Sequence, residues 1–508
     1  MRKLKKISDY DFSSKREVGV FVKSSRDPDK TETLASTTML YFFSKGYSVK
    51  NINHLLNQNS NKTPEGSISQ LIDSLNSKPY LSNIDIYSIV EFDYDSVFIP
   101  TEIREEDSRK YWGYNVARIS IYMEIVDADS KEGIYSFSTE DTTKIYRFVA
   151  YKDRLFYEYD WLVFARQLQN NLKDFPDSKN SFDSQNHTNI NIDFWVDKSY
   201  REAFSKDWND KINKMVSNAN HILRSEFNLN IISYNVYEWN QKFRKSLLNS
   251  FEMIYNKKFT GTNSFVVGLT FDNSLISGST DRTFLGFAET LGKFVIMTAR
   301  PSFPGLIDWK SAEDATTLVH EIAHLFGAIH VPDKYSILFP RMSSLYFRVD
   351  EINKTIVNKM KNNFWELDKN ERLAKYFNTL IELNEGNFKN KIPVLSLIYS
   401  KLIGANYGSE ALDYISEDFL AKVNDITRDS VYLLALQGVC FFKLKKLDLS
   451  IHLLKQAVSL KPDFAEAHWY LSKAFYENKN QTDYFIHKNL VGDYEDYWLV
   501  ESKPIKSK

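Results

Sequence analysis

The chain has 508 residues, of which 43% are hydrophobic and 26% are charged. This composition is typical of folded globular proteins, and the length is sufficient for about three domains. Lysine and arginine together number 65 and aspartate and glutamate 66, so the formal net charge is -1 and no overall positive field favours nucleic acid as a partner. Cys440 is the single cysteine, which excludes an internal disulfide and a cysteine-rich metal site. Any metal site must therefore be built from histidines and carboxylates.

The amino-terminal segment does not have the pattern of a signal peptide. Its first six residues include four basic side chains, but the polar run Ile7–Ser14 follows in place of an apolar core. No apolar run reaches the length of about 20 residues that a membrane-spanning helix needs. The sequence as it stands predicts a cytoplasmic protein without a transmembrane segment, although it leaves export open.

The first predicted domain spans residues 14–172 and is of the α/β type. It begins with a strand at 16–22, a helix at 31–45 that Gly46 can close, and a second strand at 47–49. Extended segments that end in a long hairpin are expected to follow, at residues 83–90, 96–100, 117–126 and 133–138.

Two sequence segments of this domain are similar to segments of a known group of proteins. Ser44–Val49, at the junction of a helix and a strand, and the turn Val126–Gly133 resemble parts of the small α/β domain of bacterial envelope lipoproteins of the curli-secretion and penicillin-binding-protein-activator type. The lipid-bearing cysteine of those proteins is absent here. The resemblance therefore implies a fold for this domain but no membrane anchor.

A polar connector separates this domain from a second α/β unit, predicted at residues 188–345. Residues 173–189 are rich in Asp, Ser, Asn and Lys, which is typical of a solvated linker. A helix with one buried face is predicted by apolar residues at steps of three and four: Trp208, Ile212, Met215, Ala219 and Ile222. Strands are expected at 190–196, 229–237, 264–270 and 293–298, and a further helix at 244–255.

The segment Thr317–His330 contains three of the nine histidines. Because four residues of an α-helix advance about 400°, His320 and His324 project from one face and can both reach one metal ion. Glu321 lies about 100° around the helix from His320, so its carboxylate can reach a water at that metal without binding the ion. This is the arrangement that a zinc hydrolase needs.

The third histidine predicts where this helix ends. Six further helical residues would rotate His330 about 240° away from His324, so the helix must stop between them. Gly327 is placed to end it, because glycine adopts the left-handed conformation at little cost and can reverse the chain. At the other end, Ser311 and Asp314 form a capping pattern that predicts a helix start about two turns before the first histidine.

The complete pattern, HExxHxxGxxH, resembles the extended motif of the metzincin zinc peptidases. The resemblance implies one catalytic zinc ion bound by His320, His324 and His330. It also implies that Glu321 is the general base and that Gly327 is the structural turn between the second and third ligands.

The metzincin resemblance covers about residues 188–345, and it implies an edge strand that binds the peptide substrate ahead of the active-site helix. Leu285–Thr290 stands where that strand would be. Backbone pairing along such an edge holds an extended peptide by β-augmentation. Gly286, Phe287 and Ala288 are therefore the predicted substrate-binding residues.

One position departs from the metzincin pattern. Members of the family follow the third ligand with a turn that carries a methionine beneath the metal, and this chain has Ser336–Pro340, with Leu338 at the methionine's position. Leucine nearly conserves the volume of methionine, so Leu338 is still expected to form a floor under the histidines. Met342 is the alternative if the turn is shifted. Whether the leucine lowers activity stays open.

The C-terminal region, residues 355–495, is predicted to be helical and repetitive. Three sets of residues recur at a spacing of 34: Leu402, Leu436 and Tyr470; Gly404, Gly438 and Ser472; Tyr407, Phe441 and Phe475. Ala457 and Pro462 stand where tetratricopeptide repeats place a small residue and a terminating proline, so the region resembles that family, although the first copy has Val423 and Arg428 at these places. The resemblance implies a surface for a protein partner.

These patterns predict an α+β multidomain protein with an N-terminal α/β domain, a central metzincin-like zinc peptidase domain and a C-terminal α-helical, tetratricopeptide-like repeat domain. The predicted function is that of a zinc metalloendopeptidase acting on peptide or protein substrates, whose repeats recruit a partner or substrate. The alternative hypothesis is a catalytically inactive, zinc-binding scaffold that acts through its repeats. Cys440, which could hold such a peptidase latent, is interpreted as a core residue of the repeats.

Overall fold

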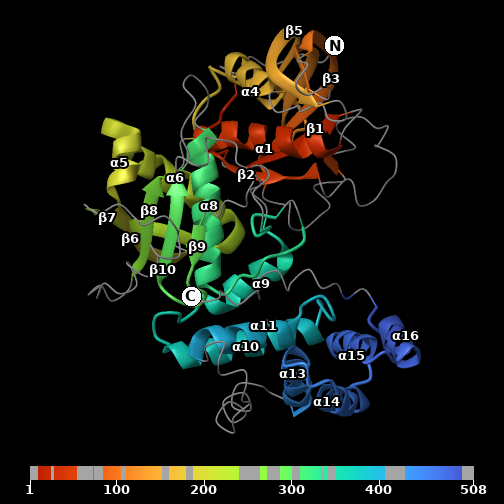
Figure 1. Ribbon diagram of the computed structural model, residues 1–508. Helices are drawn as coiled ribbons and strands as arrows, with labels where there is room; N and C mark the ends of the chain where they lie inside the picture. The colour runs from red at the N-terminus through yellow and green to blue at the C-terminus, as the bar shows by residue number, and fades with distance from the viewer. Residues whose placement is uncertain are drawn as a thin grey trace.

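The computed structural model shows two mixed sheets with helices packed against them, followed by a helical C-terminal region (Figure 1). Its description excludes residues 1–9, 16, 25–27, 54–71, 74–83, 104–109, 152–159, 179–186, 240–263, 272–285, 300–308, 334–335, 341–348, 407–429, 493 and 495–508. Within the described residues, no helix is both long and apolar enough to cross a membrane.

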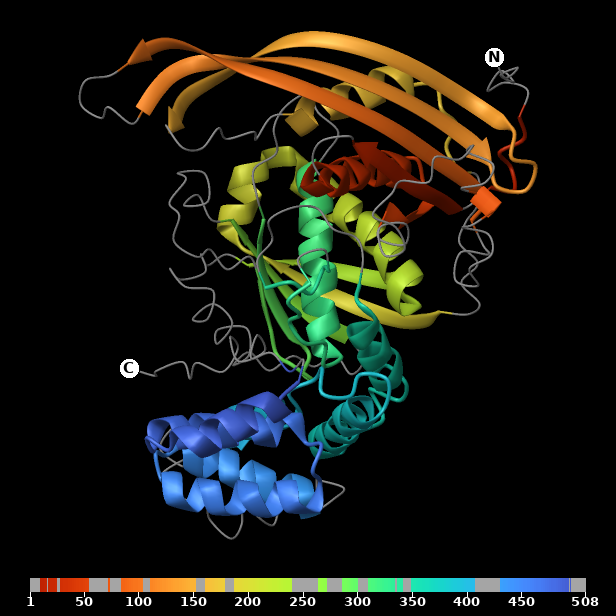
Figure 2. The same cartoon turned by 90° about the vertical axis from the view of Figure 1, so that its right-hand side faces the viewer.

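The N-terminal sheet has the strand order β2-β1-β3-β4-β5. β1 (Glu17–Ser24) pairs in parallel with β2 (Ser48–Asn51) and with β3 (Ile86–Ile103). β4 (Lys110–Asp127) and β5 (Gly133–Tyr151) continue the sheet as antiparallel neighbours. Figure 2 shows β3, β4 and β5 as long curved ribbons that arch over the rest of the domain. The segments predicted at 83–90 and 96–100 are therefore parts of one strand, β3, and the hairpin is longer than its apolar pattern indicates.

Helices α1 (Pro28–Ser44) and α4 (Asp160–Asn171) lie against one side of this sheet (Figure 2). The alternation of side chains along β1 explains the arrangement, because successive residues of a strand point to opposite faces. Val18, Val20 and Val22 belong to the main core, whereas Phe21 belongs to a second cluster.

The central sheet has the order β7-β6-β8-β10-β9. Four strands are parallel to one another: β6 (Thr188–Val196), β7 (Leu229–Glu238), β8 (Ser264–Phe271) and β10 (Phe294–Ala299). The short strand β9 (Gly286–Ala288) is antiparallel to β10 and forms the edge of the described sheet. This edge strand lies within the segment Leu285–Thr290 that the sequence indicated.

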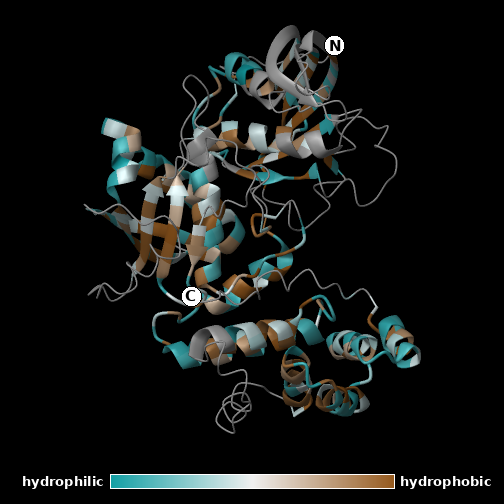
Figure 3. Ribbon diagram, in the orientation of Figure 1, coloured by the Kyte–Doolittle hydropathy of each residue, from teal (hydrophilic) through white to brown (hydrophobic). Residues whose placement is uncertain are grey.

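Two long helices, α6 (Trp208–Phe227) and α8 (Trp309–Leu325), pack side by side on this sheet, and α5 (Lys198–Phe204) precedes α6. Strand β6 buries every second residue in their common core: Ile190, Ile192, Phe194 and Val196. Figure 3 shows that hydrophobic residues are concentrated along the parallel strands of this sheet. Asn228 ends α6 in the left-handed conformation, with φ 53°, so that the chain turns back into β7. The helix predicted at 244–255 lies outside the described residues.

Seven described helices form the C-terminal region: α9 (Glu351–Met360), α10 (Lys369–Glu385), α11 (Val394–Asn406), α13 (Ser430–Lys443), α14 (Leu447–Leu460), α15 (Ala465–Glu477) and α16 (Gln481–Leu490). Three residues of the 34-residue spacing, Leu402, Leu436 and Tyr470, are each 1% exposed. The tetratricopeptide assignment stays a prediction. The boundary expected at residue 355 falls inside α9.

Cys440 lies on α13 and is fully buried. Burial raises the pKa of its thiol to about 12, so the group stays protonated at neutral pH. A protonated, buried thiol is a poor metal ligand. This environment agrees with the interpretation of Cys440 as a core residue.

Helices α13 and α14 approach closely at Gly438. A Cβ added at this glycine would lie 2.5 Å from Cγ of Leu454, and the backbone carbonyl of Gly438 accepts a hydrogen bond of 2.7 Å from the Ser450 hydroxyl. No larger side chain fits between the helices without moving them.

Replacement of Gly438 by valine should therefore lower the free energy of unfolding by about 1–3 kcal/mol, because overpacking outweighs the gain in helix propensity of less than about 1 kcal/mol. Urea denaturation followed by circular dichroism measures the effect. The matched control is Leu460→Ala on α14, whose side chain is 63% exposed, and which should change stability by less than about 0.5 kcal/mol. A valine variant as stable as the control would contradict the close approach.

Candidate metal centre

Helix α8 carries His320 and His324 on consecutive turns. They are 9% and 8% exposed, and their Nε2 atoms lie 3.0 Å apart. The rest of the helix is fixed by packing, since four apolar neighbours of the histidines are completely buried: Leu318, Val319, Ile322 and Ala323. The two imidazoles therefore project from a rigid element, as the spacing of four residues predicts.

The end of α8 is a Schellman turn centred on Gly327, which has φ +89°. The N–H of Gly327 donates to the carbonyl of His324 at 2.9 Å, and the N–H of Ala328 donates to the carbonyl of Ala323 at 3.0 Å. A Cβ added at Gly327 would lie 2.6 Å from the ring of Tyr376 on α10. Both the backbone conformation and the lack of space require glycine, so the predicted helix stop is confirmed.

The predicted start of α8 was wrong. The helix begins at Trp309, so Ser311 lies inside its first turn and not at the N-cap. Serine within a helix costs less than about 1 kcal/mol, and a Ser-x-x-Asp pattern therefore does not force a helix to begin.

After the Schellman turn the chain returns His330 to the other two histidines. The Nε2 atom of His330 lies 3.1 Å from that of His320 and 3.2 Å from that of His324. A zinc ion bound tetrahedrally at 2.0–2.1 Å holds its nitrogen ligands about 3.3–3.4 Å apart. The three nitrogens thus lie within about 0.4 Å of the separations of a tetrahedral zinc site. They form the group of possible metal ligands found among the described residues.

Backbone carbonyls fix the tautomers of two of these histidines. Nδ1 of His320 lies 2.6 Å from the carbonyl oxygen of Ile337, and Nδ1 of His324 lies 2.7 Å from that of Ala328. Because a carbonyl oxygen only accepts hydrogen bonds, each Nδ1 carries the proton and each Nε2 presents a lone pair to the centre of the group. A carbonyl that accepts from the second ring nitrogen is typical of metal-binding histidines.

Glu321 lies between α8 and the edge strand and is 5% exposed. A Cβ added at Gly286 would lie 2.3 Å from its Oε1 and 2.7 Å from its Cγ, so the side chain rests directly on the backbone of β9. Burial raises the pKa of the Glu321 carboxyl to about 8. A cation held by the three imidazoles would oppose this shift, because a nearby positive charge favours the ionised carboxylate.

The three predicted substrate-binding residues, Gly286, Phe287 and Ala288, together form β9. They pair with β10 through Met297, Ile296 and Val295, in that order. Their side chains divide between the two faces of the sheet: Ala288 packs against the main core, and Phe287 joins a small cluster on the opposite face. Gly286, which has no side chain, thus meets Glu321 with its bare Cα.

The turn after the third ligand contains Leu338, which is fully buried. The N–H of Phe339 donates to the carbonyl of Ser336 at 3.0 Å, and the N–H of Val331 donates to the carbonyl of Leu338 at 3.1 Å. A tight turn therefore stands where the sequence predicted it. The role of Leu338 as a floor beneath a metal stays a prediction, and Met342 lies outside the described residues.

Sequence reasoning missed the groups that support the histidines. The carbonyls of Ile337 and Ala328 carry no residue signature, since every residue has such a group. The contact between Gly286 and Glu321 joins two segments far apart in the chain. The lack of a side chain at Gly286 was the one signal in the sequence for this contact. It can be used only when the register of β9 is known.

Comparison with known proteins supports a metallopeptidase in this part of the chain. Residues 186–349, about a third of the sequence, match the model of Metallo-peptidase family M12. The matched region contains the central sheet, α6, α8 and all three histidines. The search of curated proteins gave no significant match.

Several solved zinc peptidases are similar to the chain at low identity. Archaemetzincin from Methanopyrus kandleri is 12% identical with a TM-score of 0.27, over 34% of this chain and 97% of its own. A zinc-dependent peptidase from Methanocorpusculum labreanum is 11% identical with a TM-score of 0.22, over 33% and 100%. Metalloproteinase-II from Bacteroides fragilis is 14% identical with a TM-score of 0.23, over 55% and 93%. Such values are too low to assign a function.

Replacement of His330 by alanine should weaken zinc binding by at least about 100-fold, because the third ligand supplies a direct bond to the metal. Competition with a chelator of known affinity measures the change. Zinc should also raise the melting temperature of the wild-type chain and not that of the variant, since a ligand that binds only the folded state stabilises it. The control His187→Ala changes a half-buried histidine that bonds to Asn228, and unchanged zinc affinity is expected. Equal affinity of the His330 variant and the wild type would contradict the site.

Proposed function

We propose that this chain is a zinc-dependent metalloendopeptidase of the metzincin type, with His320, His324 and His330 as the ligands of one zinc ion. The observation that carries the proposal is the convergence of three Nε2 atoms to within 3.2 Å of one another, with the carboxylate of Glu321 buried beside them. The match to Metallo-peptidase family M12 supports the same class of enzyme.

In the proposed mechanism Glu321 acts as the general base. A zinc ion in this site would supply Lewis acidity, which polarises a peptide carbonyl and makes water easier to deprotonate. Glu321 accepts the proton of the attacking water and then donates it to the leaving amine. Its place one residue after His320 and its contact with Gly286 hold the carboxylate near the ligands while keeping it out of the ligand set.

The edge strand β9 is the proposed substrate platform. In the described sheet β9 is the end strand and pairs with β10, and an extended peptide can add to the edge of a sheet. A peptide added along Gly286, Phe287 and Ala288 would lie beside Glu321, because that side chain contacts Gly286. Recognition through backbone groups gives affinity without fixing the substrate sequence.

The C-terminal helices are proposed to recruit a protein partner or the substrate. Two features support this role: the 34-residue spacing and several apolar side chains exposed on α14, α15 and α16, namely Leu449, Leu460, Tyr476, Phe485, Ile486 and Leu490. The alternative is a zinc-binding scaffold that has lost catalysis. Cleavage of a mixed peptide library that a hydroxamate chelator suppresses would favour the peptidase, and bound zinc without such cleavage would favour the scaffold.

Replacement of Glu321 by glutamine should leave zinc binding intact and reduce the rate of peptide cleavage by about 10²–10⁴-fold, because glutamine keeps the shape but cannot accept the proton. Zinc stoichiometry and turnover of a library-derived peptide are the two measurements. Cleavage at the wild-type rate would show that another group is the base.

Replacement of Gly286 by alanine tests the placement of this carboxylate. The new methyl group would displace the end of the Glu321 side chain, and misplacement by about 1 Å can cost about 10²-fold in rate. Zinc affinity should stay unchanged. In the double variant Gly286→Ala/Glu321→Gln, the glycine change should cause little further loss, because both changes act through one group. Additive losses would mean that Gly286 acts on the substrate and not through Glu321.

A further inference from the structure

Two backbone carbonyls that orient the histidines belong to the loop between α8 and α9. The carbonyl of Ala328 accepts from His324, and the carbonyl of Ile337 accepts from His320. His330 lies in the same loop and contributes the third imidazole. The path of this loop therefore decides the orientation of all three rings.

Asn353 on α9 binds this loop at the residue that precedes the third ligand. The N–H of Ile329 donates to Oδ1 of Asn353 at 2.7 Å, and Nδ2 of Asn353 donates to the carbonyl of Ile329 at 2.8 Å. Asn353 is completely buried. One amide side chain thus fixes the peptide groups on both sides of Ile329, which stands directly between Ala328 and His330.

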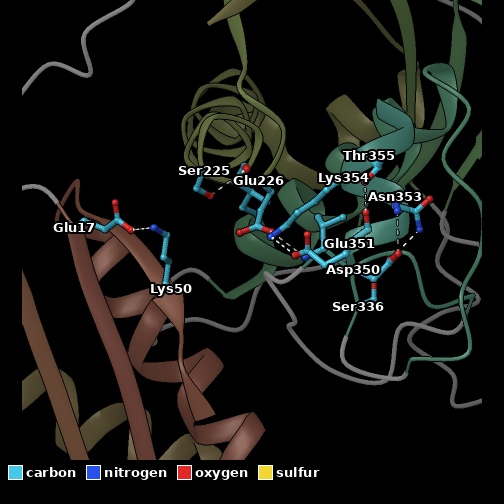
Figure 4. Close-up of polar contacts among 12 residues, drawn as sticks. Glu17, Lys50, Ser225, Glu226, Ser336, Asp350, Glu351, Asn353, Lys354 and Thr355 are labelled. Atoms are coloured by element: carbon cyan, nitrogen blue, oxygen red, sulfur yellow. Dashed lines mark hydrogen bonds and ion pairs between the residues drawn. The ribbon is translucent and has the colours of Figure 1, made fainter. Parts of the chain in front are cut away.

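The first turn of α9 also holds the second half of the loop. Asp350 caps the helix by accepting from the N–H of Asn353 at 3.0 Å, and it accepts from Nδ2 of Asn353 at 2.9 Å and from the Ser336 hydroxyl at 2.8 Å. The same hydroxyl accepts from the N–H of Leu338 at 3.1 Å. Figure 4 shows Ser336, Asp350 and Asn353 gathered at this helix end. The turn that contains Ile337 is thereby attached to α9.

Helix α9 is itself anchored on the central domain. Lys354 forms ion pairs with Glu226 at 3.0 Å and with Glu351 at 3.5 Å, and Glu226 also accepts from the N–H of Val349 at 3.1 Å (Figure 4). Glu226 lies in the last turn of α6. Three apolar residues on the inner side of α9 are also buried: Ile356, Val357 and Met360. The loop is therefore attached to α9, and contacts with α6 fix the position of α9.

We propose that Asn353 is a positioning residue of the metal centre, which holds His330 and the two orienting carbonyls in the geometry that binds zinc. The inference rests on the zinc site of the proposed function, and it deepens that function by extending the metal-binding unit into α9. This helix begins at Glu351, beyond the last residue of the region that matches the metallopeptidase family, 349.

The test is the zinc affinity of the full-length Asn353→Ala variant, measured by competition with a chelator of known affinity. Loss of a group that orients metal ligands costs about 10–100-fold in affinity, and a loss in this range is expected. Peptide cleavage should recover when the zinc concentration is raised, because Asn353 is completely buried and would act through the metal ligands. The melting temperature of the metal-free protein is measured alongside.

Asn220→Ala provides a matched control. Asn220 on α6 makes the same pair of bonds to a backbone residue: it accepts from the N–H of Ile231 at 2.7 Å and donates to the carbonyl of Ile231 at 3.0 Å. Ile231 lies on β7, at the edge of the sheet opposite to β9. This variant should lower the melting temperature of the metal-free protein and change zinc affinity by less than about twofold.

The possible outcomes distinguish the positioning role of Asn353 from the existence of the zinc site. Weaker zinc binding in Asn353→Ala alone supports the proposal, and wild-type affinity in that variant overturns it. Equal weakening in both variants also overturns it, because general destabilisation would then explain the loss. Failure of the wild-type chain to bind zinc overturns the proposed zinc site itself. If Asn353→Ala does not fold, Asn353→Ser is measured instead: its neutral hydroxyl is too short to bond both the N–H and the carbonyl of Ile329, so weaker zinc binding is expected, and wild-type affinity would overturn the proposal.

Discussion

The candidate metal centre depends on holding the Nε2 atoms of two imidazoles 3.0 Å apart, with a third imidazole next to both. His320 and His324 each direct Nε2 inward because Nδ1 donates to a backbone carbonyl. Two neutral acceptors at this separation repel one another, whereas a divalent cation between them turns the repulsion into attraction. Three features maintain an arrangement that the three rings would not adopt alone: the packing of α8, the left-handed conformation of Gly327, and the hydrogen bonds between Asn353 and the loop.

The parallel sheet and its antiparallel edge determine what this centre can do. β10 places β9 beside α8, and the missing side chain of Gly286 lets the Glu321 carboxylate lie against the strand backbone. The proposed base and the proposed substrate platform therefore touch. A side chain at position 286 would separate the strand from the carboxylate, so in the proposed enzyme this contact would couple peptide binding to proton transfer.

The sequence predicted those parts of the site that repeat with the helical period or that need glycine. His320 and His324 follow from a step of four, and the helix end follows from Gly327. Features set by other parts of the chain escaped prediction: Asn353 looks like any polar helix residue until the return loop is placed next to it. The strands of the N-terminal domain were found, but the pattern did not show that β3 is continuous, because its polar residues interrupt the apolar alternation.

Gly327 and Tyr376 couple the packing of the helical region to that of the central domain. The ring of Tyr376, on α10, occupies the space beside Gly327 that any larger residue would need. A substitution at one position is acceptable only if the other position allows it, although the two lie on elements that the sequence assigns to different domains. An exchange of these helices for those of another protein would remove the ring that packs against the end of α8.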